Sequence, residues 1–117
     1  MQVFSEHEVN FGTYAKFAWG WPGNNVIVPP NQTLTIFTAT FNYFPSGGGT
    51  LGRADLTGRD SNANAVWRTQ VVYVHPKTTN HLTFPGGLLL LAGGYVEVGF
   101  IAEGPGTIMV SLNGHLD

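Results

Sequence analysis

Hydrophobic and polar residues along this chain repeat with the period of β-strands, and no segment shows the apolar spacing of an amphipathic helix. β-Branched and aromatic residues recur in short runs, and clusters of Gly, Pro and Asn between the runs favour turns. The pattern predicts strands over Gln2–Phe11, Tyr14–Trp19, Val26–Val28, Thr33–Tyr43, Thr50–Thr57, Ala65–Val74, His81–Phe84, Tyr95–Ala102 and Thr107–Leu116.

The predicted strands differ in the polarity of their two faces. Both alternating sets of residues in Thr33–Tyr43 are largely apolar, so we expect this strand to be covered on two sides, near the centre of a sheet. By contrast, Ala65–Val74 has one partly polar face and one apolar face. Pro85-Gly86-Gly87 is typical of a break between strands, and the apolar run Leu88–Leu91 behind it predicts a buried strand.

Consecutive strands joined by short turns, without helices between them, favour a sandwich or barrel over any α/β fold. We therefore predict an all-β, antiparallel two-sheet β-sandwich that is jelly-roll-like, with about 8 to 10 strands. A chain of 117 residues has the length of one domain and can bury a core without disulfides or metal. We expect a single domain over residues 1–117.

The amino-acid composition narrows the range of partners. Charged residues make up 10% of the chain, against roughly 25% in an average soluble protein, and low charge suits a surface that is buried again in an oligomer. The five Lys and Arg residues and a net charge of −2 give no basic field, so we expect no nucleic-acid partner. No apolar stretch reaches the roughly 18 residues that span a bilayer, so we expect no membrane insertion. The localisation does not follow from the sequence.

Residues with catalytic or metal-binding potential are dispersed. The chain has no cysteine, its four histidines lack any metal-ligand spacing, and no Gly-x-Ser-x-Gly motif is present. Glu6 and Glu8 flank His7 in a predicted strand, where alternation places both acids on one solvated face. We therefore expect no metal, no cofactor and no enzymatic activity.

A polar loop followed by an aromatic residue is the most suggestive candidate for a binding site. Its hydrogen-bonding groups lie next to an indole ring, a combination that suits sugar recognition through hydrogen bonds and stacking. Arg59 and Asp60 would then fix each other. The alternative is a solvated hairpin loop with the tryptophan in the core. The candidate ligand-binding residues are Arg59, Asp60, Asn62, Asn64, Trp67 and Arg68.

Trp19 and Trp21 bracket Gly20 before a Pro-Gly turn, and strand alternation would aim both rings in the same direction. Exposed paired tryptophans on a monomer would promote association. We therefore assign both residues to an oligomer interface, with a stacking platform as the alternative. Charge depletion and these residues together predict a homo-oligomer.

The C-terminal quarter carries the family-like signal. Gly94-Tyr95-Val96-Glu97-Val98 followed by Thr107–Leu116 resembles the end of the globular heads of the tumour-necrosis-factor and complement type. Those heads close with a glycine-led strand and then a strand that runs small-apolar, small, Gly, apolar, Leu. The resemblance implies a jelly roll that forms a trimer about aromatic residues on the threefold axis. The N-terminal part of the chain does not show the pattern.

Two functions are consistent with these features. The first is a non-catalytic oligomeric binding module, lectin-like, with a glycan as its ligand. The second is a structural assembly protein, such as a phage or virion decoration, fibre or shell component. A binder should expose aromatic rings beside polar groups in a concave patch, whereas a shell protein should bury its aromatic residues between subunits.

Overall fold

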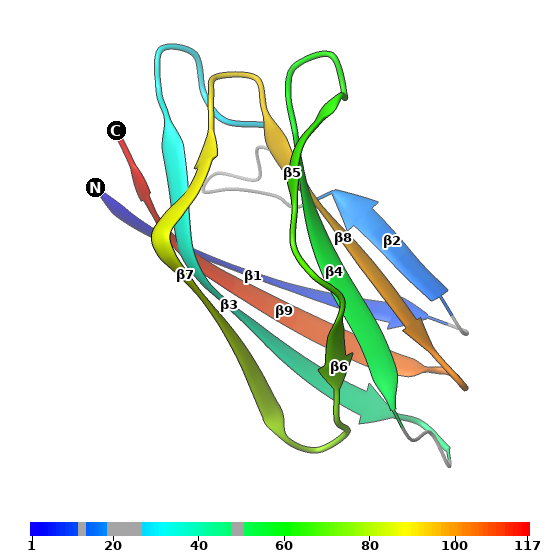
Figure 1. Cartoon of the computed structure of the whole chain (residues 1–117). Coiled ribbons are helices and arrows are strands. Elements are labelled where there is room, and N and C mark those ends of the chain that lie inside the picture. The colour runs from blue at the N-terminus through cyan, green and yellow to red at the C-terminus, as the bar shows by residue number, and fades with distance from the viewer. Residues whose placement is uncertain (12–13, 19–26, 48–50) are drawn as a thin grey trace.

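The computed structural model describes residues 1–11, 14–18, 27–47 and 51–117, which form two antiparallel sheets packed face to face (Figure 1). Among these residues there is no helix that is long and apolar enough to cross a membrane. Sheet A has the strand order β1-β9-β3-β7, and sheet B has the order β2-β8-β4-β5, with β6 also paired to β4. The bounds are β1 Gln2–Phe11, β2 Tyr14–Ala18, β3 Leu34–Pro45, β4 Gly52–Arg59, β5 Ala65–Arg68, β6 Val72–Val74, β7 Thr79–Leu90, β8 Tyr95–Ala102 and β9 Gly106–Leu116.

The strands pair in a nested order. β1 pairs with β9, β2 with β8, β3 with β7, and β4 with both β5 and β6. The chain also passes between the two sheets as it goes from β1 to β4 and again from β6 to β9. This winding is that of a jelly roll, in which two Greek keys enclose one core. The predicted fold class, an all-β antiparallel two-sheet sandwich, is confirmed.

The core lies between the inward faces of the two sheets, because every second residue of a strand points to the same side. The edge-to-face pair of Tyr43 and Phe100 joins the sheets, with ring centroids 5.2 Å apart and an interplanar angle of 62°. The largest fully buried side chains are Tyr43, Phe41, Phe100, Leu34, Ile36, Leu56, Leu90, Ile108, Leu112, Val28 and Val74.

The prediction of one continuous strand over Ala65–Val74 is wrong, because this segment forms two strands, β5 and β6. Thr69 lies in the gap and ties the chain to β4 in two ways. Its backbone N–H donates to the carbonyl of Leu56 at 2.9 Å, and its hydroxyl accepts from the Leu56 N–H at 3.0 Å. In a regular β-ladder a backbone carbonyl would accept the hydrogen bond from the Leu56 N–H. Here the Thr69 hydroxyl accepts it, and the strand is interrupted at this point.

The predicted break at Pro85-Gly86-Gly87 is also wrong, because β7 continues through it. Gly86 and Gly87 have φ values of 79° and 81°, and the pairing with β3 shifts register between Ile36 and Thr38. The two glycines thus form an irregularity inside one long strand. Val28, part of another predicted strand, lies outside the described strands and exchanges backbone hydrogen bonds with Gly93 and Gly94.

β3 lies inside sheet A, between β9 and β7, as its apolar character predicts. Its outward face differs from the prediction of two covered sides. Phe37 and Phe44 are 43% and 48% exposed, so that the described chain covers only the inward face of this strand.

Candidate functional site

The outward face of sheet B gathers charged side chains from three neighbouring strands. Residues of β4 alternate between inward apolar positions such as Leu56 and outward polar positions. Antiparallel pairing then places residues of β8 and β5 beside them. The outward positions of β4 are Arg53, Asp55, Thr57 and Arg59.

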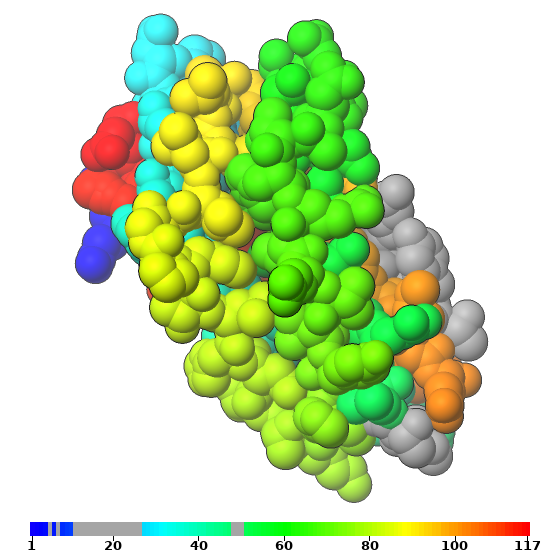
Figure 2. Space-filling model, in the orientation of Figure 1, coloured from blue at the N-terminus to red at the C-terminus, as the bar shows by residue number. Residues whose placement is uncertain are grey.

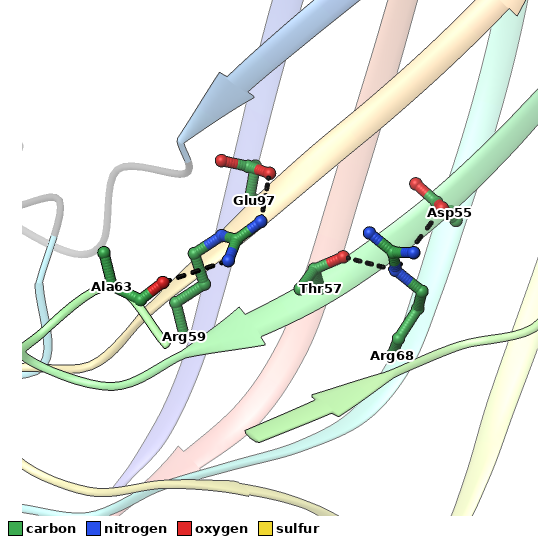
Figure 3. A network of polar contacts seen from close by, with 6 residues as sticks. All are labelled: Asp55, Thr57, Arg59, Ala63, Arg68 and Glu97. Carbon is green, nitrogen blue, oxygen red and sulfur yellow. Dashed lines mark hydrogen bonds and ion pairs between the residues drawn. The ribbon is translucent and has the colours of Figure 1, made fainter. Parts of the chain in front are cut away.

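Arg59 is held in place by two partners on this face (Figure 3). Its Nη2 donates to Glu97 Oε1 at 3.1 Å, and its Nη1 donates to the carbonyl oxygen of Ala63 at 3.0 Å. The hydrogen bond to Glu97 raises the pKa of the guanidinium above its ordinary value. Arg59 therefore stays charged and links β4, β8 and the hairpin loop after β4.

Arg68 forms a second contact set nearby (Figure 3). Its Nε donates to the hydroxyl of Thr57 at 3.2 Å, and the same nitrogen lies 3.9 Å from Asp55 Oδ2. The longer contact with Asp55 is an ion pair in high-dielectric surroundings, where such pairs contribute little. Thr57 is only 2% exposed although it lies on the outward face. The two arginine contact sets therefore form a polar network that covers the middle of sheet B.

A gap in this network lies at Gly99, which pairs with Asp55 in the register of β4 and β8. A Cβ atom at Gly99 would lie 2.7 Å from Asp55 Oδ1, so a larger residue would displace the carboxylate. An open hollow of about 280 Å³ occupies this region. Its lining combines charged side chains such as Asp55 and Arg68 with the apolar Val71 and Ile101.

An apolar patch with a cation at its centre adjoins the polar network. Arg53 pairs in register with Tyr73 on one side and Ile101 on the other, and those two residues are 58% and 45% exposed. Leu51 and Val71 are exposed as well. None of the ion pairs formed among the described residues involves Arg53. We call Leu51, Arg53, Val71, Tyr73 and Ile101 the Arg53 patch.

The polar loop predicted as a ligand site divides into separate roles. Asp60 Oδ1 accepts the backbone N–H groups of Asn62 and Asn64, both at 2.9 Å, so Asp60 closes the hairpin turn. The expected mutual fixing of Arg59 and Asp60 is wrong, because Arg59 reaches Glu97 instead. The side chains of Asn62 and Asn64 lie at the exposed tip of the loop. Ligand binding by this loop stays a prediction.

Trp67 packs inward rather than toward the polar network. Its Nε1 donates to the carbonyl oxygen of Leu89 at 3.0 Å, and its ring contacts the core over Gly58. Arg68, the next residue along β5, points to the outward face. The structure thus brings Arg59 and Arg68 to one face of sheet B and separates them from the indole ring. Trp19 and Trp21 lie outside the described residues.

Sequence reasoning missed the Arg53 patch and the acids of the polar network. A signal was present, because Arg53, Asp55, Thr57 and Arg59 alternate with apolar or small residues, which is the pattern of one polar face. Residues from β6 and β8 join this face only through strand pairing, and the pairing of distant strands is not visible in the sequence. Tyr73 and Ile101 therefore could not be placed beside Arg53.

A groove at the open edge of the sandwich lies between β7 and the β5–β6 segment. Figure 2 shows these two segments side by side, in yellow and green. The groove has a volume of about 500 Å³, and Leu82, Phe84 and Leu88 of β7 form one wall. Hydrophobic side chains thus line the seam where the two sheets end.

Within the described part of the chain, no group of three or more His, Cys, Asp or Glu residues is arranged to hold a metal ion. No protein-family model matches the chain, and no curated protein matches it significantly. The resemblance to tumour-necrosis-factor and complement heads is therefore limited to the jelly-roll-like fold, and it does not assign the chain to that family.

Solved structures that match the chain include particles of infectious bursal disease virus. T=1 particles derived from this virus match with 9% identity and a TM-score of 0.40, over 97% of this chain and 29% of theirs. The Gx strain matches with 11% identity and a TM-score of 0.37, over 99% and 28%. The T13 viral particle matches with 10% identity and a TM-score of 0.33, over 99% and 32%. The chain thus spans about a third of the length of these proteins, or less.

Proposed function

We propose that this protein is a non-catalytic structural module that acts by self-association, as a component of a larger assembly. The Arg53 patch carries the proposal. An exposed tyrosine and an arginine lie in one cross-strand row with an exposed isoleucine. Tyrosine and arginine are among the residue types that supply most of the energy of protein interfaces.

The low charge of the chain supports the same function. Only 10% of its residues are charged, and interface cores are depleted in charge. Large apolar side chains are exposed on both sheets, including Phe4, Phe37 and Phe44 on sheet A. Large contiguous patches of apolar surface are rare on proteins that stay monomeric, because such patches promote association.

Mass measurement by light scattering across about 1 μM to about 1 mM protein tests self-association. We expect the mass to rise with concentration from the chain mass of 12.6 kDa to a defined multiple. The resemblance of the C-terminal quarter supports three copies as the end state. A constant mass of 12.6 kDa over the whole range would refute self-association.

A substitution in the patch refines this test. Ile101→Asp should keep the protein monomeric, because it places a charge in an apolar contact. Leu91→Asp is the matched control, since Leu91 is 66% exposed but lies in the turn after β7. Equal effects of the two substitutions would contradict a role of the Arg53 patch.

A second function, glycan binding, is favoured by the hollow beside Gly99. Carboxylate, guanidinium and aliphatic groups meet there, a combination that binds sugars through hydrogen bonds and apolar contact. Titration calorimetry of the protein with a panel of oligosaccharides tests this function, with Asp55→Asn as the variant that should lose binding. If no sugar gives a heat of binding, the hollow is a feature of the interface instead.

A further inference from the structure

The two sheets carry opposite charges. The described side chains of sheet B include three arginines, Arg53, Arg59 and Arg68, and two carboxylates, which gives a net charge of +1. The strands of sheet A contain two carboxylates, Glu6 and Glu8, and no Lys or Arg, which gives a net charge of −2 with histidine neutral. The two sheets lie on opposite sides of the core (Figure 1). The molecule is therefore polarised, with a cationic sheet on one side and an acidic sheet on the other.

The acidic side chains of sheet A have apolar neighbours, as Arg53 has on sheet B. Glu6 and Glu8 are exposed on the outward face of β1, as alternation predicts. Phe4, two positions before Glu6, is 57% exposed, and Met109 pairs in register with Glu8. We call Phe4, Glu6, Glu8 and Met109 the acidic patch. It matches the Arg53 patch in kind, with the sign of the charge reversed.

Side chains on the outward face of sheet A are already held in place by cross-strand hydrogen bonds. A surface whose side chains are fixed loses little conformational entropy when a partner covers it. The bonds join Ser111 Oγ to Glu6 Oε2 (3.2 Å), Thr107 Oγ1 to Asn10 Oδ1 (2.6 Å), Thr79 Oγ1 to Asn42 Oδ1 (3.1 Å) and Thr40 Oγ1 to His81 Nδ1 (3.1 Å).

From this complementarity we infer that each outward face binds a second copy of this chain. The Arg53 patch of one copy docks on the acidic patch of the next. The inference rests on the proposed self-association and names its surfaces. Contacts between like faces are disfavoured, because two copies of the acidic patch, or two of the Arg53 patch, would bring like charges together.

Docking of unlike faces makes the interface heterologous. The two patches lie on opposite sides of the sandwich, so each copy in a contact keeps one patch free for a further copy. Such contacts produce a closed ring if the rotation between copies closes, and an open stack if it does not.

Charge reversal at either patch tests this arrangement in the full chain. Arg53→Glu and the double variant Glu6→Lys/Glu8→Lys should each weaken self-association by at least about tenfold, because each brings like charges into the contact. The controls are Lys77→Glu and Asp117→Lys, which make single charge reversals of the same signs outside both patches. Circular dichroism and thermal melts show whether each variant is folded.

Mixing the two patch variants gives the decisive measurement. Each variant keeps one native patch, so an equimolar mixture of Arg53→Glu with Glu6→Lys/Glu8→Lys should recover complexes that neither forms alone. If Arg53→Glu dissociates the protein while the Glu6→Lys/Glu8→Lys variant associates normally, the interface joins like faces and the inference is overturned. Oligomers that persist in both variants overturn it as well. A monomeric wild type would instead refute the proposed function itself.

Discussion

At the scale of single residues, the packing of Trp67 depends on the absence of a side chain at Gly58. Gly58 pairs with Trp67 in the register of β4 and β5, and a Cβ atom at Gly58 would overlap the indole ring. The ring also uses its N–H to bond the carbonyl of Leu89, which ties sheet B to β7 of sheet A. Glycine at this position thus allows one side chain to connect both sheets.

Gly58→Ala should therefore destabilise the protein by about 1–3 kcal/mol, the usual cost of overpacking. Gly47→Ala is the matched control, because no atom lies within 4 Å of a Cβ placed there. Urea denaturation of both variants measures the free energies of unfolding. If Gly58→Ala is as stable as the control, the indole can move aside without losing its contacts.

Tyr43 makes the free energy of unfolding depend on pH in the alkaline range. Burial of the phenol, and to a lesser extent the nearby carboxylate of Glu103, raise its pKa above the ordinary value of 10.0. The folded protein therefore keeps this proton at pH values where the unfolded chain loses it. The contribution to stability is complete below pH 10 and is lost as the pH rises toward the folded-state pKa.

Tyr43→Phe should remove this dependence, since phenylalanine fills almost the same space and does not titrate. We expect the free energy of unfolding to fall less in Tyr43→Phe than in the wild type between about pH 8 and about pH 11. Equal losses in the two proteins would show that other groups cause the alkaline destabilisation.

At the scale of strands, the hydrophobic pattern located the elements but not their interruptions. The predicted Thr33–Tyr43 corresponds closely to β3, because alternation over a long apolar segment has few other solutions. The errors at β5, β6 and β7 have local causes. Thr69 replaces a ladder bond with its hydroxyl, and β3 provides a partner on which β7 continues past Pro85. Neither partner can be identified from the local sequence.

The glycine pair in β7 allows a comparison within one irregularity. Both glycines have positive φ, so alanine at either position should cost about 1–2 kcal/mol of backbone strain. Only at Gly87 would a Cβ atom also overlap Thr35, whereas nothing lies within 4 Å at Gly86. Urea denaturation should show Gly87→Ala to be less stable than Gly86→Ala. If Gly86→Ala were the less stable variant, overlap with Thr35 would not decide the cost of a side chain in this irregularity.

At the scale of the whole molecule, the candidate site could be predicted only in part. Arg59 and Arg68 were identified from the polarity of one loop and its neighbouring strand, and both lie on the outward face of sheet B. The residues that complete that face come from β6 and β8, which are distant in sequence. The opposite charges of the two sheets likewise depend on the winding, because the order of strands in each sheet decides which charges share a face.

Ionic strength should act on the assembly as a whole. Raising the salt concentration from about 0.1 M to about 1 M shortens the Debye length from about 10 Å to about 3 Å, which screens contacts between oppositely charged faces. We expect the dissociation constant for self-association to rise over this range, and to rise less in Arg53→Ala. Sedimentation equilibrium at both concentrations measures it. Association that is independent of salt would assign the contact to apolar burial alone.

The position of β9 has a consequence for the order of folding. β9 follows all the other described strands in the chain, yet it lies inside sheet A between β1 and β3, and Gln2 pairs with His115. Contacts between residues so far apart require the closure of very long loops, which slows folding. During synthesis, β1 and β3 emerge long before β9, the strand that lies between them. Until then, the edges that pair with β9 are unpaired. The nascent chain is therefore exposed to aggregation until β9 leaves the ribosome.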